Sequence, residues 1–407
     1  MNRFLSGISL LALAAGSCLA MASSAAAADA TKSTFSVLYT FTGGYDGGVP
    51  LSGLISDKQG NLYGTAYQGG ADNLGTTYRL APDGTETPLI TFDSTNGQSP
   101  GYGYLIQDTS GNLFGTTGAG GADNYGAVYS LAPDGTEQVL YSFASQSDGD
   151  DIAYGLVEDK NGNFYGTAYE GGPNNEGEVY EVTPGGTKTM LWAFCSQANC
   201  TDGDGPLSQL IIDRHGNLYG TTLVGGAYGW GTVFELSPPG KGQTQWTETV
   251  LHSFANVGGG ITDGCYPSAG VMMDKSGNLY GTTYGCGGYT NGNNNGDGSV
   301  YMIAANGTES LLYGFSAGND GMSPHSTLVE DKDGNLYGTT EAGGADNDGT
   351  VFKIPAGGGS DVILHTFTGG SDGANPYSGL YRKGSWLYGT ASAGGANGAG
   401  TVFKVKD

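Results

Sequence analysis

Basic residues are scarce in this chain of 407 residues: 15 Lys and Arg stand against 39 Asp and Glu, and the formal net charge is −24. Such a chain repels polyanions, which argues against nucleic acid and anionic membrane surfaces as partners. Long apolar runs are also missing beyond the N-terminal segment. A spanning helix needs about 20 consecutive apolar residues, so we expect no transmembrane span.

The residue types that carry most catalysis and metal binding are few, because the chain has 4 His and 5 Cys. The sequence contains no nucleophile elbow, no metal-ligand spacing and no glycine-rich phosphate loop. Motifs therefore predict no catalytic residue and no metal ligand.

The N-terminus has the three parts of a secretory signal. Arg3 supplies the positive charge, residues 4–15 are apolar, and residues 23–28 are small. We predict a signal peptide over 1–28, a short linker over 29–35 and a single folded domain over 36–407. The mature protein is expected to be a monomer in the periplasm or outside the cell.

Glycine is abundant, with 77 residues, and it recurs at fixed places. The stretch Gly334-Asn335-Leu336-Tyr337-Gly338-Thr339-Thr340 has seven versions, whose aromatic residues are Tyr63, Phe114, Tyr165, Tyr219, Tyr280, Tyr337 and Tyr388. Their spacing runs from 51 residues (Tyr63 to Phe114) to 61 residues (Tyr219 to Tyr280). A period of this length, built from short strands, is typical of a β-propeller.

One repeat, residues 328–367, contains four short strands. They are expected over 328–331, 336–340, 350–354 and 362–367, with turns rich in Gly, Asp and Asn between them. Four antiparallel strands make one propeller blade. The glycine after each strand aromatic costs strand stability, and we expect it to make room for a large side chain of the neighbouring blade. The aromatic itself is expected to pack between blades.

Seven segments match the fourth strand, and the mature chain begins with such a strand (37–41) and ends with a third strand (401–403). Pairing the first segment with the last three strands would close the ring and leave no free edge there. The predicted fold class is all-β: a seven-bladed β-propeller with four antiparallel strands per blade, in which the N-terminal strand completes the last blade.

The repeat unit is specific in its order: Gly-Asn-Leu-Tyr-Gly-Thr-Thr, Gly-Gly, Gly-Thr-Val-Phe, Leu-Tyr-x-Phe and Asp-Gly-x-x-Pro. It resembles the GloVer (Gloeo/Verruco) tandem repeat of bacterial extracellular proteins, most clearly over 334–352 and in all over about 36–405. That family is described by its repeat and not by an activity. The resemblance therefore implies a repeat propeller outside the cytoplasm and transfers no catalytic residue.

Two sets of loops should lie at the same end of the propeller: those from a fourth strand to the next first strand, and those from second to third strands. None of them contains Lys or Arg, and they are rich in Asp. We predict that this end is a strongly acidic face and the candidate for ligand binding. The residues assigned to it are Asp46, Asp148, Asp202, Asp263, Asp320, Asp372 and His325. Turn formation is the stronger explanation of the aspartates; a cation site or a sugar site is the alternative, and Ca²⁺ is the cofactor hypothesis that they leave open.

Four cysteines, Cys195, Cys200, Cys265 and Cys286, follow the predicted signal. Cys195 and Cys200 share one loop, and the loops that hold Cys265 and Cys286 lie at the same end of one blade. We predict the disulfides Cys195–Cys200 and Cys265–Cys286, which an exported protein can form.

The histidines give a weaker signal. His252 and His365 occupy the strand position held elsewhere by Tyr39, Tyr141 or Tyr313, which indicates a packing role, whereas His325 follows Pro324 and could border the central channel. The leading hypothesis is a secreted binding or scaffold module that holds a glycan, a cation or a protein on its acidic face. The alternative is an exported polysaccharide lyase or hydrolase with its site at the channel mouth.

Overall fold

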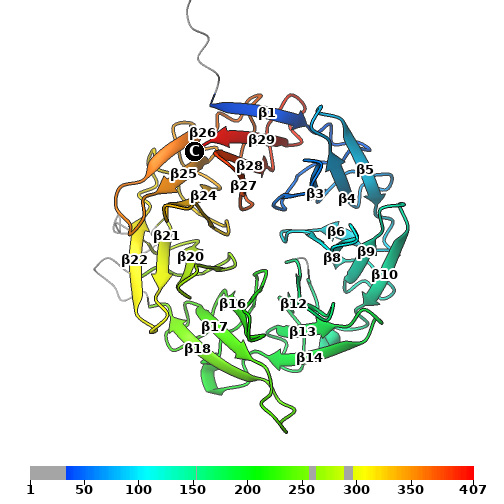
Figure 1. Cartoon of the computed structure of the whole chain (residues 1–407), viewed down its shortest axis with the longest axis vertical. Helices are drawn as coiled ribbons and strands as arrows, with labels where there is room; N and C mark the ends of the chain where they lie inside the picture. Colours follow the sequence, from blue (N-terminus) through cyan, green and yellow to red (C-terminus); the bar gives the residue numbers. More distant parts are fainter. Residues whose placement is uncertain (1–33, 153, 256–262, 288–296) are drawn as a thin grey trace, which may run out of the picture. The chain divides into compact units, whose positions relative to one another are not determined.

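A computed structural model describes residues 34–152, 154–255, 263–287 and 297–407, and Thr34–Asp407 form one compact unit. The predicted signal peptide (1–28) and residues 29–33 of the predicted linker lie outside the described residues. The unit is a ring of seven four-stranded antiparallel sheets (Figure 1). The prediction of a seven-bladed propeller is therefore confirmed.

Each blade has an inner, a second, a third and an outer strand. The inner strands are β2 (Ile55–Ser56), β7 (Ile106–Gln107), β11 (Val157–Glu158), β15 (Ile211–Ile212), β19 (Met272–Met273), β23 (Val329–Glu330) and β27 (Tyr381–Lys383). The second strands are β3 (Leu62–Ala66), β8 (Leu113–Ala119), β12 (Phe164–Ala168), β16 (Leu218–Thr222), β20 (Leu279–Thr283), β24 (Leu336–Thr340) and β28 (Trp386–Ala391).

The third strands are β4 (Thr76–Leu80), β9 (Ala127–Leu131), β13 (Glu178–Val182), β17 (Thr232–Ser237), β21 (Ser299–Ile303), β25 (Thr350–Ile354) and β29 (Thr401–Lys406). The outer strands are β5 (Glu86–Thr91), β10 (Glu137–Ser142), β14 (Lys188–Ala193), β18 (Thr247–Ser253), β22 (Glu309–Gly314), β26 (Val362–Thr366) and β1 (Phe35–Thr40). Blade 2 carries an additional short strand, β6 (Gln98–Pro100), beside β8, and the 3₁₀ turns η1 (Gln146–Asp148) and η2 (Ala198–Cys200) lie between blades.

The ring closes where the N-terminal strand joins the last blade. β1 pairs antiparallel with β29, from Phe35 opposite Val405 to Thr40 opposite Thr401. The two strands lie side by side in Figure 1 although they are at opposite ends of the described chain. The predicted closure is confirmed.

The glycine that follows the strand aromatic has a different neighbour from the one expected. Gly64 lies directly opposite Tyr78 of the third strand in the same blade, and a Cβ atom on it would meet the Tyr78 Oη atom at 2.6 Å. Gly115 stands in the same relation to Tyr129. The prediction that this glycine accommodates the neighbouring blade was wrong. It makes room for an aromatic of its own sheet, because side chains opposite each other in a ladder share one face.

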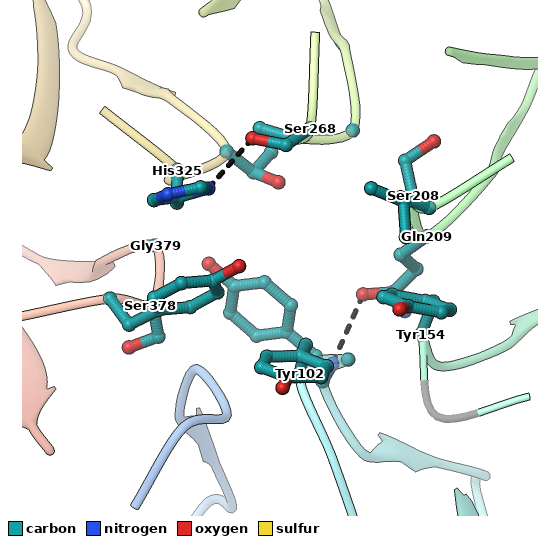
Figure 2. Close-up of a pocket in the computed structure, with 15 residues that line it drawn as sticks. Tyr102, Tyr154, Ser208, Gln209, Ser268, His325, Ser378 and Gly379 are labelled. Atoms are coloured by element: carbon teal, nitrogen blue, oxygen red, sulfur yellow. Dashed lines mark hydrogen bonds between the residues drawn. The ribbon is translucent and has the colours of Figure 1, made fainter. Parts of the chain in front are cut away.

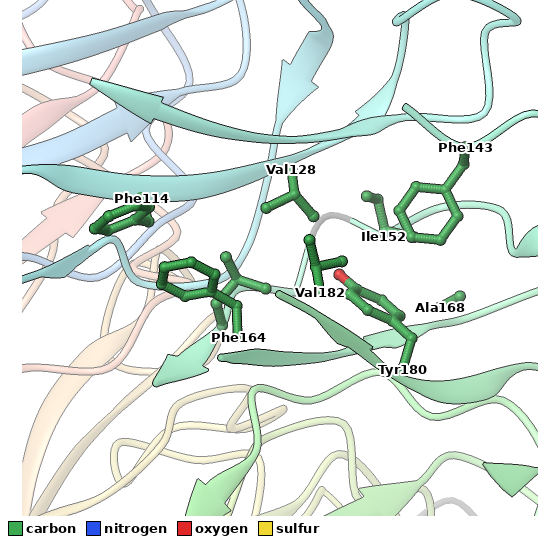
Figure 3. Close-up of a cluster of buried hydrophobic side chains, with 9 residues drawn as sticks. Phe114, Val128, Phe143, Ile152, Phe164, Ala168, Tyr180 and Val182 are labelled. Carbon is green, nitrogen blue, oxygen red and sulfur yellow. The ribbon is translucent and has the colours of Figure 1, made fainter. Parts of the chain in front are cut away.

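The second-strand aromatics do pack between blades, as predicted. Phe114 of blade 2 contacts Phe164 of blade 3 with ring centroids 4.4 Å apart, in a buried cluster that includes Tyr180 (Figure 3). An equivalent cluster lies at each of the other six seams, as we call the contacts between neighbouring blades. At the seam between blades 7 and 1, Tyr388 packs against Leu62 and Tyr78. Each buried ring contributes about 2 kcal/mol through the apolar area removed from water.

Two kinds of loop meet at one end of every blade, as predicted. We call the connection from an outer strand to the next inner strand a crossing loop, and that from a second to a third strand a hairpin loop. Backbone bridges such as Gly48 to Gln68 and Met322 to Ala342 join the two. The disulfides are Cys195–Cys200 within one crossing loop and Cys265–Cys286 between the two loops of blade 5, which confirms both pairings. Over the described residues, no helix is long and apolar enough to cross a membrane.

Candidate functional site

The six predicted site aspartates, Asp46, Asp148, Asp202, Asp263, Asp320 and Asp372, occupy equivalent places in crossing loops; we call them the rim aspartates. Asp320 shows their bonding: its carboxylate accepts hydrogen bonds from Tyr313 Oη (3.0 Å), Ser316 N and Oγ (both 2.8 Å) and Gly318 N (3.1 Å). Burial opposes ionisation of Asp46, yet hydrogen bonds from Thr42 and Tyr39 hold its pKa below the ordinary value. These carboxylates lock their own loops.

The outer-strand histidines bond to the same carboxylates. His252 Nε2 lies 2.8 Å from Asp263 Oδ2, and His365 Nε2 lies 3.1 Å from Asp372 Oδ2, where other blades use a tyrosine hydroxyl. The two histidines therefore replace tyrosine in a repeated contact, in line with the packing role predicted for them. Burial lowers the pKa of His365 although the contact with Asp372 acts in the opposite direction.

The rim aspartates do not converge on one point. Each belongs to a different blade, and the described part of the chain holds no group of three or more His, Cys, Asp or Glu placed to bind a metal ion. The Ca²⁺ hypothesis stays a prediction, with no assembled ligand set behind it.

A second set of acidic side chains stands at or beside the start of the outer strands; four of the five lie near a rim aspartate, and Glu137 lies beside Asn96 instead. These seam carboxylates are Glu86, Glu137, Glu248, Glu309 and Asp361. Burial, reinforced by the neighbouring Asp46 or Asp202, raises the pKa of Glu86 and of Glu248 to about 7. In blade 3 the position holds Lys188, whose ammonium lies 3.1 Å from Asp148 and 2.6 Å from Glu178. The ammonium of Lys188 thus reaches the rim aspartate Asp148 from a strand and not from a loop.

The central channel is hollowed at this end into a pocket of about 130 Å³, which we call the mouth pocket (Figure 2). It is lined where the crossing loops enter the inner strands. The side chains used below are Tyr102, Tyr154, Gln209, Ser268, His325 and Tyr377. His325 is the one predicted site residue that lines the pocket; the rim aspartates do not.

Aromatic rings form an arc around the mouth pocket. Tyr102 stacks on Tyr154 with centroids 5.6 Å apart and lies 5.2 Å from Tyr377. Tyr377 stacks on His325 at 4.4 Å, and Tyr284 contacts the same histidine at 4.5 Å. These side chains come from five different blades, so the propeller ring itself holds the arc together.

Tyr104 and Gln209 form the floor of the pocket. A Cβ on Gly53 would lie 2.0 Å from the Tyr104 ring, and one on Gly379 would lie 2.0 Å from its hydroxyl, so both glycines are required for the ring to lie across the channel. Gln209 accepts from Tyr104 N (3.2 Å) and donates to Leu156 O (2.6 Å). Beyond this floor a second, largely apolar cavity of about 780 Å³ opens among the inner strands.

Two carboxylates flank the pocket. Asp151 accepts a hydrogen bond from Tyr154 Oη (3.4 Å), and burial together with the charge of Asp150 raises its pKa to about 6. Glu341 Oε2 lies 3.2 Å from His325 Nε2. The pKa of Tyr102 is raised mainly by burial, then by the neighbouring Tyr67, and also by the charges of Asp151 and Glu341. Both carboxylates are therefore close enough to the mouth to act on Tyr102.

Sequence reasoning missed most of these residues because it searched for recurring ones. Ser268, His325 and Tyr377 all directly follow the proline of a crossing loop, where blades 1 and 4 have Leu51 and Leu207. Glu341 likewise takes a place held by tyrosine in blades 1, 3 and 5. The available signal was variation at these two repeat positions.

Comparison with solved structures supports the fold. The extracellular domain of the putative one-component system BT4673 of B. thetaiotaomicron gives a TM-score of 0.56 at 9% identity, covering 90% of this chain and 39% of that chain. A second structure, of the extracellular domain of the putative hybrid two-component system BT4673, gives the same values. The putative 6-phosphogluconolactonase of Bacteroides uniformis gives 0.49 at 17% identity, covering 78% and 84%. At 9% identity the likeness to the two BT4673 structures shows architecture alone.

No curated protein matches the chain. The model of the Gloeobacter/Verrucomicrobia repeat, in contrast, matches residues 26–158, 145–293 and 286–407. These matches cover the described propeller and agree with the repeat unit found in the sequence. The chain therefore belongs to the Gloeobacter/Verrucomicrobia repeat family.

Proposed function

We propose that this propeller is an exported binding module that holds a carbohydrate in the mouth pocket. The observation that carries the proposal is the aromatic arc of Tyr102, Tyr154 and Tyr377 at a cavity where loops of several blades converge. Flat aromatic rings offer apolar faces to sugar rings, and the phenol, amide and hydroxyl groups between them can bond to sugar hydroxyls.

The charges around the pocket favour a neutral sugar over an acidic one. Asp151 and Glu341 flank the mouth, and no crossing or hairpin loop carries Lys or Arg in the sequence. The ammonium of Lys188 is neutralised by Asp148 and Glu178. Uronate or sulfate groups would lack a counter-charge here. The enzymatic alternative drawn from the sequence is a polysaccharide lyase or hydrolase, and the missing counter-charge disfavours only a lyase that acts on uronic acid polymers.

The floor determines how a sugar would enter. Tyr104 and Gln209 block the channel, so a bound chain would insert one end and extend out of the mouth. The pocket volume of about 130 Å³ fits one sugar residue in preference to a long segment. The two disulfides support an extracytoplasmic location, where such polymers occur.

Isothermal titration with neutral oligosaccharides of glucose, xylose and N-acetylglucosamine, and with oligogalacturonate, tests the proposal. We expect at least one neutral oligosaccharide to bind and oligogalacturonate not to bind. Tyr102→Ala and Tyr377→Ala should each abolish binding without unfolding the protein. Tyr45→Ala, at a 64% exposed tyrosine in a crossing loop, is the matched control. Binding that persists in both pocket variants, or no binding to any neutral sugar, would refute the proposal.

A further inference from the structure

Three side chains of the mouth form a chain of polar contacts, made of one hydrogen bond and one close approach of a ring nitrogen to a carboxylate. Ser268 Oγ lies 2.8 Å from His325 Nδ1, and His325 Nε2 lies 3.2 Å from Glu341 Oε2. Ser268 and His325 line the mouth pocket, and Figure 2 shows the contact between them. The repeat does not require this chain for folding, because the serine and histidine positions hold leucine in blades 1 and 4.

The carboxylate of Glu341 favours the tautomer of the neutral ring that carries its hydrogen on Nε2, because a carboxylate cannot donate to that nitrogen. Nδ1 is then left with its lone pair, and it accepts the hydroxyl hydrogen of Ser268. A hydroxyl bonded to a basic imidazole nitrogen, which a third group orients, is the arrangement of an activated nucleophile.

Packing holds the histidine in this orientation. Its ring lies between Tyr284 at 4.5 Å and Tyr377 at 4.4 Å, and its side chain is 11% exposed. Tyr102 and Tyr377 line the same cavity. Their phenol groups are hydrogen-bond donors that could stabilise a carbonyl oxygen as it becomes negatively charged.

We propose that Ser268 and His325 are the nucleophile and general base of an ester hydrolase site, with Glu341 as their positioning residue. Ser268 Oγ attacks the ester carbonyl carbon while Nδ1 takes the hydroxyl proton. The C–O bond to the alcohol then breaks, and the alcohol leaves with that proton. Water, deprotonated by the same nitrogen, attacks the acyl-serine; the nitrogen then returns its proton to Ser268 Oγ as the acyl C–O bond breaks, and the carboxylic acid leaves. The net reaction consumes one water per ester and requires neither metal nor oxidant.

The size of the pocket limits the acyl group to a small one. An O-acetyl group fits, and an acetylated sugar would combine this chemistry with the aromatic arc. The hydrolytic step itself goes beyond the proposed carbohydrate binding and does not depend on it, because an activated aryl ester needs only the serine and the histidine.

The test uses the full propeller with p-nitrophenyl acetate and with a fluorophosphonate that labels activated serines. Wild-type protein should release p-nitrophenol and be labelled at Ser268, as located by peptide mass mapping. His325→Gln should reduce hydrolysis on the order of 10²–10⁴-fold, and Ser268→Ala should abolish labelling. Glu341→Gln should slow hydrolysis, and Glu341→Asp should restore part of the rate. Ser276→Ala, at an exposed serine on the opposite end of blade 5, is the control.

Thermal melts establish that the variants fold, and labelling of the wild-type protein needs no variant. Hydrolysis by Ser268→Ala at the wild-type rate, or a wild-type protein that is not labelled at Ser268, overturns the inference. Sugar binding without labelling would leave the proposed function standing and reject the hydrolase. Labelling without sugar binding would do the reverse.

Discussion

The rim aspartates and the mouth pocket lie at the same end of the propeller but follow opposite rules. The rim repeats: Asp46, Asp320 and Asp372 each accept hydrogen bonds from the start of their own crossing loop. The mouth does not repeat, since Ser268, His325 and Tyr377 occupy one repeat position in three successive blades. The difference teaches that in this chain repetition marks the scaffold and departures from repetition mark the candidate site.

The strongest test of the repeated scaffold is a glycine opposite an aromatic. Gly64→Ala would place a Cβ 2.6 Å from Tyr78 Oη and 3.1 Å from Leu54. We expect a loss of about 3 kcal/mol of unfolding free energy, because a buried ring between packed blades cannot retreat. Chemical denaturation measures the loss, and Gly185→Ala, with 3.9 Å to its nearest atom, is the control. Equal stability of the two variants would contradict the packing described here.

A rim aspartate should affect stability and leave the mouth pocket unchanged. Asp320→Ala removes the acceptor for Tyr313, Ser316 and Gly318. We expect a loss of about 2 kcal/mol, because the Ser316 and Gly318 donors lose this acceptor while Tyr313 keeps Asp361; sugar binding and ester hydrolysis should be retained. Asp346→Ala, at an exposed aspartate in the hairpin loop of the same blade, should cost little. Loss of binding in a folded Asp320→Ala protein would remove the distinction between rim and mouth.

The seam carboxylates predict a pH dependence of the scaffold. The folded-state pKa of Glu86 and Glu248, about 7, lies above the ordinary value near 4.5. Their contribution to stability is therefore complete below about pH 4.5 and is lost as the pH rises through 7. Thermal melts should show a lower midpoint at about pH 8 than at about pH 5.

The double variant Glu86→Gln/Glu248→Gln keeps both groups neutral and should flatten that dependence. After allowance for solvent screening, we expect about 1 kcal/mol per site at the higher pH. Asp83→Asn is the control, because hydrogen bonds from Thr85 lower the pKa of Asp83 and keep it ionised over the whole range. An unchanged slope in the double variant would show that other groups govern the pH response.

The smallest effect is expected for calcium. The rim carboxylates already accept hydrogen bonds from their own loops and do not converge, so millimolar Ca²⁺ should shift the melting midpoint by less than about 1 °C relative to chelator. If Ca²⁺ raises the melting midpoint by several degrees and Asp320→Asn abolishes that rise, the rim aspartates bind a ligand. The distinction between a structural rim and a functional mouth pocket would then fail. Differential scanning fluorimetry is sufficient to decide.

The sequence predicted the blade count, the closure and both disulfides because each rests on a local pattern repeated seven times or on loops that share an end. The neighbour that the sequence predicted for Gly64 was wrong. Spacing along the chain does not tell whether the space beside a glycine is filled by an aromatic of the same blade, here Tyr78, or of the next blade. The sequence pointed to His325 by its proline but not to Ser268 or Glu341. Ser268 and Glu341 come close to His325 only in the folded ring, where blades 5 and 6 are neighbours. Neither residue belongs to a recognisable sequence motif.

The pairing of β1 with β29 determines how the propeller would respond to force. The N-terminal end of β1 lies beside the C-terminal end of β29, since Phe35 faces Val405. Tension applied to the two termini would therefore load the ladder at one end and open its hydrogen bonds one after another, instead of shearing them all at once. A propeller tethered by both ends should open at low force at this junction, with the other six blades still folded.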